Sequence, residues 1–258
     1  MAGNNARPGV SVTSKVVALL GAFDAEHRVL TLSELARRAD VPVATAFRLV
    51  GELVANGLLE RRPAGDYAVG RRLWDLGLLA PVQSELRDVA SPFLQDLYGA
   101  TLATVHLAIR DGHEVLYLDR LSGNASVPVV SQVGSRLPLH ATGVGKVLLA
   151  HAPAEVVMAV LGRLTRITPY TITQPGRLRA ELRRVHKEGF AQTTEEMSLG
   201  ACSVAVSIRA PGGPVVAALG IVVPSLKRDR PQLVAALRVA ARGIGRQVDE
   251  LASSVSTE

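Results

Sequence analysis

Apolar residues recur at helical spacing near the start of the chain. In SKVVALLGAF they occupy positions i, i+3, i+4 and i+7: Val16, Leu19, Leu20 and Phe23. This spacing is typical of a helix with one buried face, and it predicts a helix that begins near Ser14. A similar stripe in TLSELARRAD predicts a second helix, whose start is indicated by Thr31 and Glu34 at the spacing of a capping box.

A third helix is predicted over VATAFRLVGELVANG, directly after a break at Asp40-Val41-Pro42. Proline supplies no N–H and disfavours helical angles in the residue before it, so the second helix is expected to end here. The third helix is expected to end at Asn56-Gly57. Its predicted buried stripe is Phe47, Val50, Leu53 and Val54. A tight turn between two short helices, with small and polar residues facing outward from the second, is the arrangement of a helix-turn-helix.

The segment LLERRPAGDYAVG, which follows the third helix, predicts a hairpin. The apolar runs Leu58-Leu59 and Tyr67-Ala68-Val69 flank a Pro-Ala-Gly-Asp turn. A hairpin directly after a helix-turn-helix is the wing of a winged helix. Its two arginines, Arg61 and Arg62, are placed to neutralise phosphates.

The outward positions of the third helix are candidates for reading DNA bases. An α-helix fits the major groove of B-DNA, and residues near its N-terminus reach the base edges. We predict that Thr45 and Arg48 contact bases and that Val43 and Ala44 touch a thymine methyl group. Phosphate contacts are predicted for four arginines: Arg37, Arg38, Arg61 and Arg62. A generic three-helix packing unit is the alternative interpretation of the same pattern.

Strands mix with helices in the remaining two thirds of the chain. TVHLAIRDGHEVLYLDR predicts two strands around an Asp111-Gly112 turn, and further strands are predicted at VPVVSQV, SVAVSI and VVAALGIVV. Helices are predicted from Ser91-Pro92 to Gly99, over RLRAELRRVHKEGF before Gly189, and near the C-terminus. Hairpins combined with helices indicate an α+β domain.

The stretch LPLHATGVGK, residues 137–146, looks like a nucleotide-binding loop but lacks two of its requirements. A P-loop needs a glycine where this chain has His140, and a serine or threonine where it has Val147. What remains is a helix start whose backbone N–H groups at Ala141, Thr142, Gly143 and Val144 are expected to be free. Such a helix start favours a carboxylate or a similar anion. In the alternative interpretation, the glycines only allow close packing and Lys146 points to water.

Composition narrows the class of protein. A length of 258 residues suits two domains, and 48% hydrophobic with 20% charged residues indicates a folded chain. The single cysteine, Cys202, excludes an internal disulfide framework and a multi-cysteine zinc site. The start MAGNNARPGV has no apolar leader, and no run of about 18 apolar residues follows, so we expect a cytoplasmic protein without a membrane span.

Motifs of enzyme chemistry are missing from the sequence. No G-x-S-x-G, H-E-x-x-H or cysteine cluster occurs, and the six histidines are scattered. His106 and His140 are predicted to be hydrogen-bonded structural histidines, and Glu195-Glu196 to be a solvated turn or pocket rim. We therefore expect no catalytic residues and no bound metal or cofactor.

Three motifs in this order resemble the IclR family of bacterial transcriptional regulators: LSELARRADVPVATAFRLVGELVANGLLER, YAVGRRLWDLG and GSRLPLHATGVGKVLLA. The resemblance runs from about residue 11 to residue 252. It implies a winged helix-turn-helix DNA-binding domain over residues 11–70, a linker helix over 71–86 and a GAF-like, α+β effector-binding domain over 87–252. It also implies dimers, often paired into tetramers, on double-stranded DNA with a near-palindromic operator.

In the IclR family the loop at residues 137–146 lines the effector pocket, together with the segment after E-x-x-x-G and the strand that follows it. Carried over position by position, the resemblance implies an effector site at Val129, Leu137, Thr142, Gly143, Val144, Thr193, Ala201, Ser203, Gly220 and Val222. Thr193 stands where relatives often carry an acid, and Gly220 and Val222 stand where many have a serine pair. The pocket is therefore expected to be less polar than theirs and to favour an aromatic or hydrophobic carboxylic acid over a small keto acid.

The sequence thus predicts a ligand-responsive transcription factor, either repressor or activator. The effector would change the arrangement of the DNA-binding heads through residues 71–86. Two alternatives stay open. One is a constitutive DNA-binding protein whose second domain is structural and mediates oligomerisation, and the other is an enzyme fused to a DNA-binding head.

Overall fold

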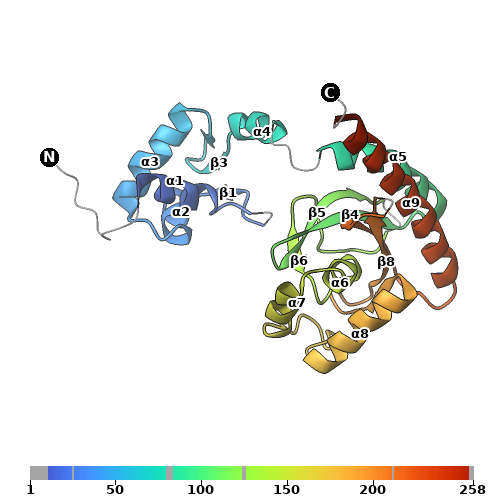
Figure 1. Cartoon of the computed structure of the whole chain (residues 1–258). Helices are drawn as coiled ribbons and strands as arrows, with labels where there is room; N and C mark the ends of the chain where they lie inside the picture. Colours follow the sequence, from blue (N-terminus) through green and yellow to red (C-terminus); the bar gives the residue numbers. More distant parts are fainter. Residues whose placement is uncertain (1–10, 25, 80–83, 124–125, 211, 256–258) are drawn as a thin grey trace. The chain divides into compact units, whose positions relative to one another are not determined.

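The computed structural model describes residues 11–24, 26–79, 84–123, 126–210 and 212–255. The chain divides into two compact units, residues 1–82 and 83–258. In the first unit three helices pack together, α1 (Val12–Leu20), α2 (Leu32–Arg38) and α3 (Val43–Ala55), and a fourth, α4 (Arg71–Leu78), follows them. A small antiparallel sheet of order β1-β3-β2 packs with them (Figure 1): β1 (Val29–Leu30), β2 (Leu59–Arg61) and β3 (Tyr67–Val69). The predicted winged helix-turn-helix is confirmed. Strand β1 was not predicted, because a strand of two residues is too short to show a periodic pattern.

Local signals in the sequence fix several ends of these elements. At the start of α2 the capping box is complete: the Glu34 amide donates to Thr31 Oγ1 at 3.3 Å, and the Thr31 amide donates to Glu34 Oε2 at 2.8 Å. Helix α1 begins two residues before the predicted Ser14, because Ser11 caps it by accepting from the Ser14 amide at 3.0 Å. In the wing turn Gly65 has φ of 89°, a left-handed angle that favours glycine.

The buried face of α3 differs from the predicted one. Phe47 was predicted to point inward, but it is 66% exposed. Two of the predicted residues, Val50 and Leu53, are buried as expected, and Ala46 and Leu49 complete the buried face in place of Phe47 and Val54. The prediction for Phe47 was wrong because an alanine gives a weaker apolar signal than a phenylalanine, although Ala46 is the residue that lies in the core of this unit.

The linker predicted over residues 71–86 falls on two helices. Helix α4 (Arg71–Leu78) ends at its C-cap Leu79, and α5 (Ser84–Thr101) begins at Ser84, while residues 80–83 lie outside the described part. The helix start predicted at Ser91-Pro92 is wrong, because Pro92 lies inside α5. An interior proline costs about 3 kcal/mol. Burial of Leu86, Leu94 and Leu97 on one face of α5, at about 1.5–3 kcal/mol each, outweighs that cost.

The second unit is a six-stranded antiparallel sheet with helices on both faces (Figure 1). The strand order is β6-β5-β4-β9-β8-β7. The strands are β4 (Thr104–Asp111), β5 (Glu114–Leu121), β6 (Arg136–Pro138), β7 (Ala191–Thr194), β8 (Cys202–Arg209) and β9 (Val215–Val223). Helices α5 and α9 (Arg230–Val255) cover one face. The other face is covered by α6 (Gly143–Ala150), with α7 (Ala154–Leu161) and α8 (Pro175–Glu188) packed on α6.

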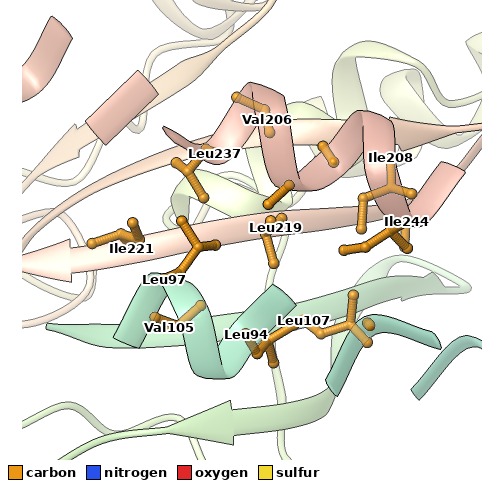
Figure 2. Close-up of a cluster of buried hydrophobic side chains, with 14 of the residues drawn as sticks. Leu94, Leu97, Val105, Leu107, Val206, Ile208, Leu219, Ile221, Leu237 and Ile244 are labelled. Atoms are coloured by element: carbon orange, nitrogen blue, oxygen red, sulfur yellow. The ribbon is translucent and has the colours of Figure 1, made fainter. Parts of the chain in front are cut away.

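The larger core of this unit lies between α5, α9 and the central strands. Figure 2 shows two residues of α5 and two of α9 against the sheet: Leu94, Leu97, Leu237 and Ile244. The strand residues that they meet are Val105, Leu107, Val206, Ile208, Leu219 and Ile221. Because helices cover both faces of the sheet, residues 104–108 of β4 are buried without a break instead of at alternate positions. The predicted α+β architecture is confirmed.

Most predicted strands are present, and one is not. Hairpin β4–β5 turns at Gly112, and SVAVSI and VVAALGIVV form β8 and β9. The segment VPVVSQV forms no strand: Pro128 has no N–H for a ladder, and the carbonyl of Ser131 accepts from Arg120 Nη1 at 2.9 Å instead of from a neighbouring strand. The edge strands β6 and β7 were not predicted, because their few residues do not show a clear alternation.

Candidate functional site

A cavity of about 490 Å³, including solvent at its mouth, lies at the sheet face that α6 covers. All ten residues predicted for the effector site line it: Val129, Leu137, Thr142, Gly143, Val144, Thr193, Ala201, Ser203, Gly220 and Val222. They come from strands, a helix start and two irregular segments that are far apart in the sequence. The fold therefore brings together the positions that the resemblance implied.

Neighbouring strands form the floor of the cavity. Gly220 of β9 lies opposite His106 of β4 and opposite Ala205 of β8, while Ser203 of β8 lies opposite Thr193 of β7. Successive side chains of a strand point to opposite faces, so these cross-strand neighbours all face α6. Glycine and alanine at the centre leave the space that larger side chains would fill.

The N-terminus of α6 forms one wall and approaches the floor closely. A Cβ on Gly143 would lie 2.5 Å from Ser203 Oγ, and a Cβ on Gly220 would lie 2.8 Å from Val144 Cγ1. Both distances are shorter than Cβ contacts in folded proteins, so a side chain at position 143 or 220 would force Ser203 or Val144 to move. Thr142 caps the helix by accepting from the Gly145 amide at 3.1 Å.

The amides in the first turn of α6 have no acceptor within the helix, which leaves those of Gly143 and Val144 available beside the cavity. One expectation for this turn is wrong, because the Ala141 amide is not free and donates to the Pro138 carbonyl at 3.4 Å. The helix start therefore offers fewer free amides to an anion than the sequence predicted.

The polar groups of the cavity are neutral. Burial, helped by the charge of Arg120, lowers the pKa of His106 to about 3, so the imidazole carries no charge near neutral pH. His106 Nε2 lies 2.8 Å from Ser131 Oγ, and its ring packs edge-on against Tyr117 with centroids 4.9 Å apart. Burial raises the pKa of Tyr117, opposed by a hydrogen bond with Thr142. Among the described residues that line the cavity, none is Lys, Arg, Asp or Glu.

Several lining residues were missed by sequence reasoning. They are His106, Tyr117, Val130, Ser131, Met197, Ser198, Val204, Ala205 and Ile221. One signal was present: His106 is a polar residue between the apolar Val105 and Leu107. Its prediction as a hydrogen-bonded histidine is confirmed, and so is that of His140, whose Nε2 lies 2.9 Å from the Thr165 carbonyl oxygen. The others had no signal, because they meet only when the sheet and its loops are folded.

Lys146 and Glu196 form a buried ion pair next to this cavity. The side chain of Lys146 is fully buried, and its Nζ lies 2.5 Å from Glu196 Oε1. The expectations of a lysine in water and of a solvated Glu196 are therefore wrong. Burial raises the pKa of Glu196, and the Lys146 charge opposes that shift. The pair joins α6 to the segment 195–201 that carries the lining residues Met197 and Ser198.

The first unit presents a separate candidate surface at the start of α3. Val43 is 54% exposed, Ala44 and Arg48 are exposed, and Thr45 is partly buried. Phe47, which was not predicted for this surface, is also exposed. The outward face of α3 is thus exposed enough to enter the major groove of DNA.

The arginines predicted to hold phosphates differ in how they are held. Arg37, Arg61 and Arg62 are exposed. Arg38 instead donates from Nη2 to Asp24 Oδ2 at 2.5 Å and from Nε to the Ala22 carbonyl at 2.7 Å. Arg38 therefore connects α2 to the segment after α1 with donors that a phosphate would otherwise use.

Two family models match the chain. The IclR helix-turn-helix domain matches residues 12–63, and the model described as bacterial transcriptional regulator IclR C-terminal matches residues 80–246. Among curated relatives, the HTH-type transcriptional regulator KdgR of Dickeya chrysanthemi is 29% identical over 245 residues, which are 93% of this chain and 80% of the relative. The HTH-type transcriptional repressor AllR of Escherichia coli K12 is 30% identical over 230 residues, 87% of this chain and 85% of the relative.

Solved structures give the same result. An IclR homolog from Microbacterium hydrocarbonoxydans, complexed with 4-hydroxybenzoate, is 37% identical with a TM-score of 0.86, covering 92% of this chain and 98% of that one. The IclR of Thermotoga maritima is 29% identical with a TM-score of 0.74, over 92% and 98% of the two chains. Within the described residues, no helix combines the length and the apolar run needed to cross a bilayer.

Proposed function

The chain belongs to the IclR family of bacterial transcriptional regulators, and on that premise we propose that its second unit senses a small effector in the cavity beside α6. One observation carries the proposal: the ten positions implied by the family resemblance all line one cavity. The curated relatives are named as regulators and none of those cited as an enzyme, which supports a sensing role in preference to catalysis. Such a regulator would act in the cytoplasm, where bacterial DNA lies.

The proposed effector is an aromatic monocarboxylic acid. The walls carry apolar side chains such as Val129, Leu137 and Val222, which suit a ring better than a small keto acid. No lining cation is available for a carboxylate, so the amides of Gly143 and Val144 at the positive end of α6 are assigned to it. The structural neighbour that holds 4-hydroxybenzoate supports this ligand class.

Calorimetric titration of the full chain tests the ligand class. We expect 4-hydroxybenzoate and benzoate to bind more tightly than pyruvate at equal ionic strength, because only an aromatic ring fills the apolar walls. A tighter pyruvate complex would reject the aromatic class. Binding of none of a panel of carboxylic acids would favour the constitutive regulator whose second unit is structural.

The proposed DNA contacts lie on α3 and the wing. Thr45 and Arg48 are assigned to bases, and Val43 and Ala44 to a thymine methyl group. Arg37, Arg61 and Arg62 are assigned to phosphates. Arg38 is at the surface too, but it is assigned to the fold of the domain because it donates to Asp24 and to the Ala22 carbonyl. A homodimer, alone or paired into a tetramer, would read a near-palindromic operator, and the effector would alter the arrangement of its heads through α4 and the residues after it.

A further inference from the structure

A second hollow of about 500 Å³, solvent included, lies in the second unit where the chain enters α8. Its polar lining comes from the segment before the helix and from the first helical turn: Arg166, Tyr170, Thr171, Thr173, Gln174 and Arg177. It shares no lining residue with the cavity beside α6. It is therefore a separate candidate site.

The charge of this hollow has one sign. Two guanidinium groups line it, from Arg166 and Arg177, and its lining residues include no carboxylate. In the described part of the chain, neither arginine takes part in an ion pair. Unpaired arginines that converge on a hollow favour an anion there.

Two long hydrogen bonds orient the exposed side chain of Arg166. Its Nη1 donates to the Pro169 carbonyl at 3.3 Å, and its Nη2 donates to Thr173 Oγ1 at 3.4 Å. A guanidinium has five N–H donors in a planar fork, so these two bonds orient the group and leave further donors for a ligand. A pre-oriented fork loses less side-chain freedom when an oxyanion binds.

The start of α8 adds to the positive potential. Gln174 occupies its N-cap position without a side-chain hydrogen bond, and its first turn contains no acidic residue. Helix α2 shows the contrast, because Thr31 caps it and the Glu34 carboxylate neutralises its positive end. The end of α8 that meets the hollow has no such neutralising group among the described residues.

We propose that this hollow binds the dianionic phosphate group of free phosphate or of a phosphate monoester. Planar guanidinium groups hold phosphate oxygens in paired, charge-assisted hydrogen bonds, and Arg166 and Arg177 supply two such groups. The Tyr170 hydroxyl and the Gln174 amide, in the same lining, offer neutral donors. A concave site fits a small ligand better than it fits the long backbone of a nucleic acid.

Hydrogen bonds link this hollow to the first cavity. Thr171 lines the hollow, and its hydroxyl donates to the Glu196 carbonyl at 2.7 Å, while the Thr168 hydroxyl donates to the Glu195 carbonyl at 2.7 Å. The next residues, Met197 and Ser198, line the first cavity. Phosphate in the hollow is therefore expected to change the affinity of the first cavity for its ligand, a consequence that rests on the proposed function.

Calorimetric titration of the full chain with inorganic phosphate tests the site, with chloride adjusted to keep ionic strength constant and no effector present. We expect saturable binding that weakens about tenfold in Arg166→Gln and in Arg177→Gln, the loss typical of one charge-assisted hydrogen bond. Arg183→Gln is the control, because Arg183 is exposed on the same helix and does not line the hollow. Glycerol 3-phosphate, titrated in parallel, tells whether the free or the esterified group is preferred.

Two results would overturn the proposal. In one, phosphate binding is absent, or Arg183→Gln lowers it as much as the other two variants do. Equal losses would mean that the positive charge of the helix attracts anions without a specific site. In the other, Arg166→Gln and Arg177→Gln weaken binding to a random DNA duplex while phosphate does not saturate, which makes this face a nucleic-acid contact. Since no effector is used, failure of the effector proposal would leave the phosphate result unchanged.

Discussion

Helices α3 and α6 begin in similar ways and end up in opposite environments. Both have one valine and one small residue at their first two positions, Val43-Ala44 and Gly143-Val144, after the N-cap residues Pro42 and Thr142. The first turn of α3 is mostly exposed, whereas every residue of α6 is buried. A helix start that is exposed can enter the major groove of DNA, whereas one that is enclosed can contact only a ligand that fits into the cavity.

The substitution with the largest expected effect on the free energy of unfolding is at Lys146 in α6. Lys146→Met should lower the free energy of unfolding by about 3–5 kcal/mol, because it leaves the Glu196 carboxylate buried without its partner. Urea unfolding measures the loss, and the double variant with Glu196→Gln should recover part of it. An exposed cation of α3 offers the matched control, since Arg48→Met should change unfolding by no more than about 0.5 kcal/mol.

The Lys146→Met variant should also be sensitive to pH. Burial raises the pKa of Glu196, and the variant removes the charge that opposes this shift. A carboxyl group with a raised pKa in the folded state stabilises the fold below its ordinary pKa, and this contribution is lost as pH rises through the raised value. The free energy of unfolding should therefore fall as pH increases over that window. A variant whose stability instead rises with pH there would contradict the assignment of Glu196.

Gly143→Val tests how closely α6 must approach the sheet. The added Cβ would meet Ser203 Oγ at 2.5 Å, so overpacking should cost about 1–3 kcal/mol of stability. The new side chain also occupies the cavity, and 4-hydroxybenzoate binding should be abolished while operator binding is kept. Unchanged affinity for the acid would remove this helix start from the effector site.

Arg48 and Arg62 separate base reading from phosphate binding in the first unit. Arg48→Ala should cost about 1–3 kcal/mol on the operator and relax preference at one base pair, whereas Arg62→Ala should weaken all sequences alike and flatten the salt dependence by about one unit. Binding to specific and random duplexes over a salt series measures both. Identical behaviour of the two variants would reject the assignment of Arg48 to a base.

The smallest expected effect lies at Gly51, an exposed glycine inside α3. A Cβ at Gly51 would meet nothing within 4 Å, so Gly51→Ala should stabilise the domain by about 0.5–1 kcal/mol through helix propensity alone. Thermal unfolding measures the gain. A loss of stability would show that this face of α3 is more tightly packed than its exposure indicates.

Local signals made much of the fold predictable. The capping box at Thr31 and Glu34, the turn at Gly112 and the long apolar run of β9 each depend on neighbouring residues, and each was placed correctly. Predictions failed where burial decided against a local rule. Pro92 lies inside α5 because leucines bury its face, and Phe47 is exposed because Ala46 fits the interior.

The candidate site also contains residues that could be predicted and residues that could not. Its ten expected positions came from a family resemblance, and no periodicity in the sequence would have gathered them. Ser131 and Met197 belong to segments without regular structure, so their place in the lining could not be predicted from spacing. Lys146 and Glu196 are fifty residues apart, and nothing local connects them.

The sequence by itself determined the three helices of the winged helix-turn-helix, the hairpins β2–β3 and β4–β5 and the presence of a helix start after the loop at residues 137–146, because these depend on spacing, capping and turn residues within one segment. Only the tertiary structure decided that α6 would be enclosed, that Lys146 would find a carboxylate, and that His106 would lose its charge in a cavity. Burial is a property of the folded molecule, since it depends on distant segments that exclude water together, and it sets the charge state and the partners of each polar group.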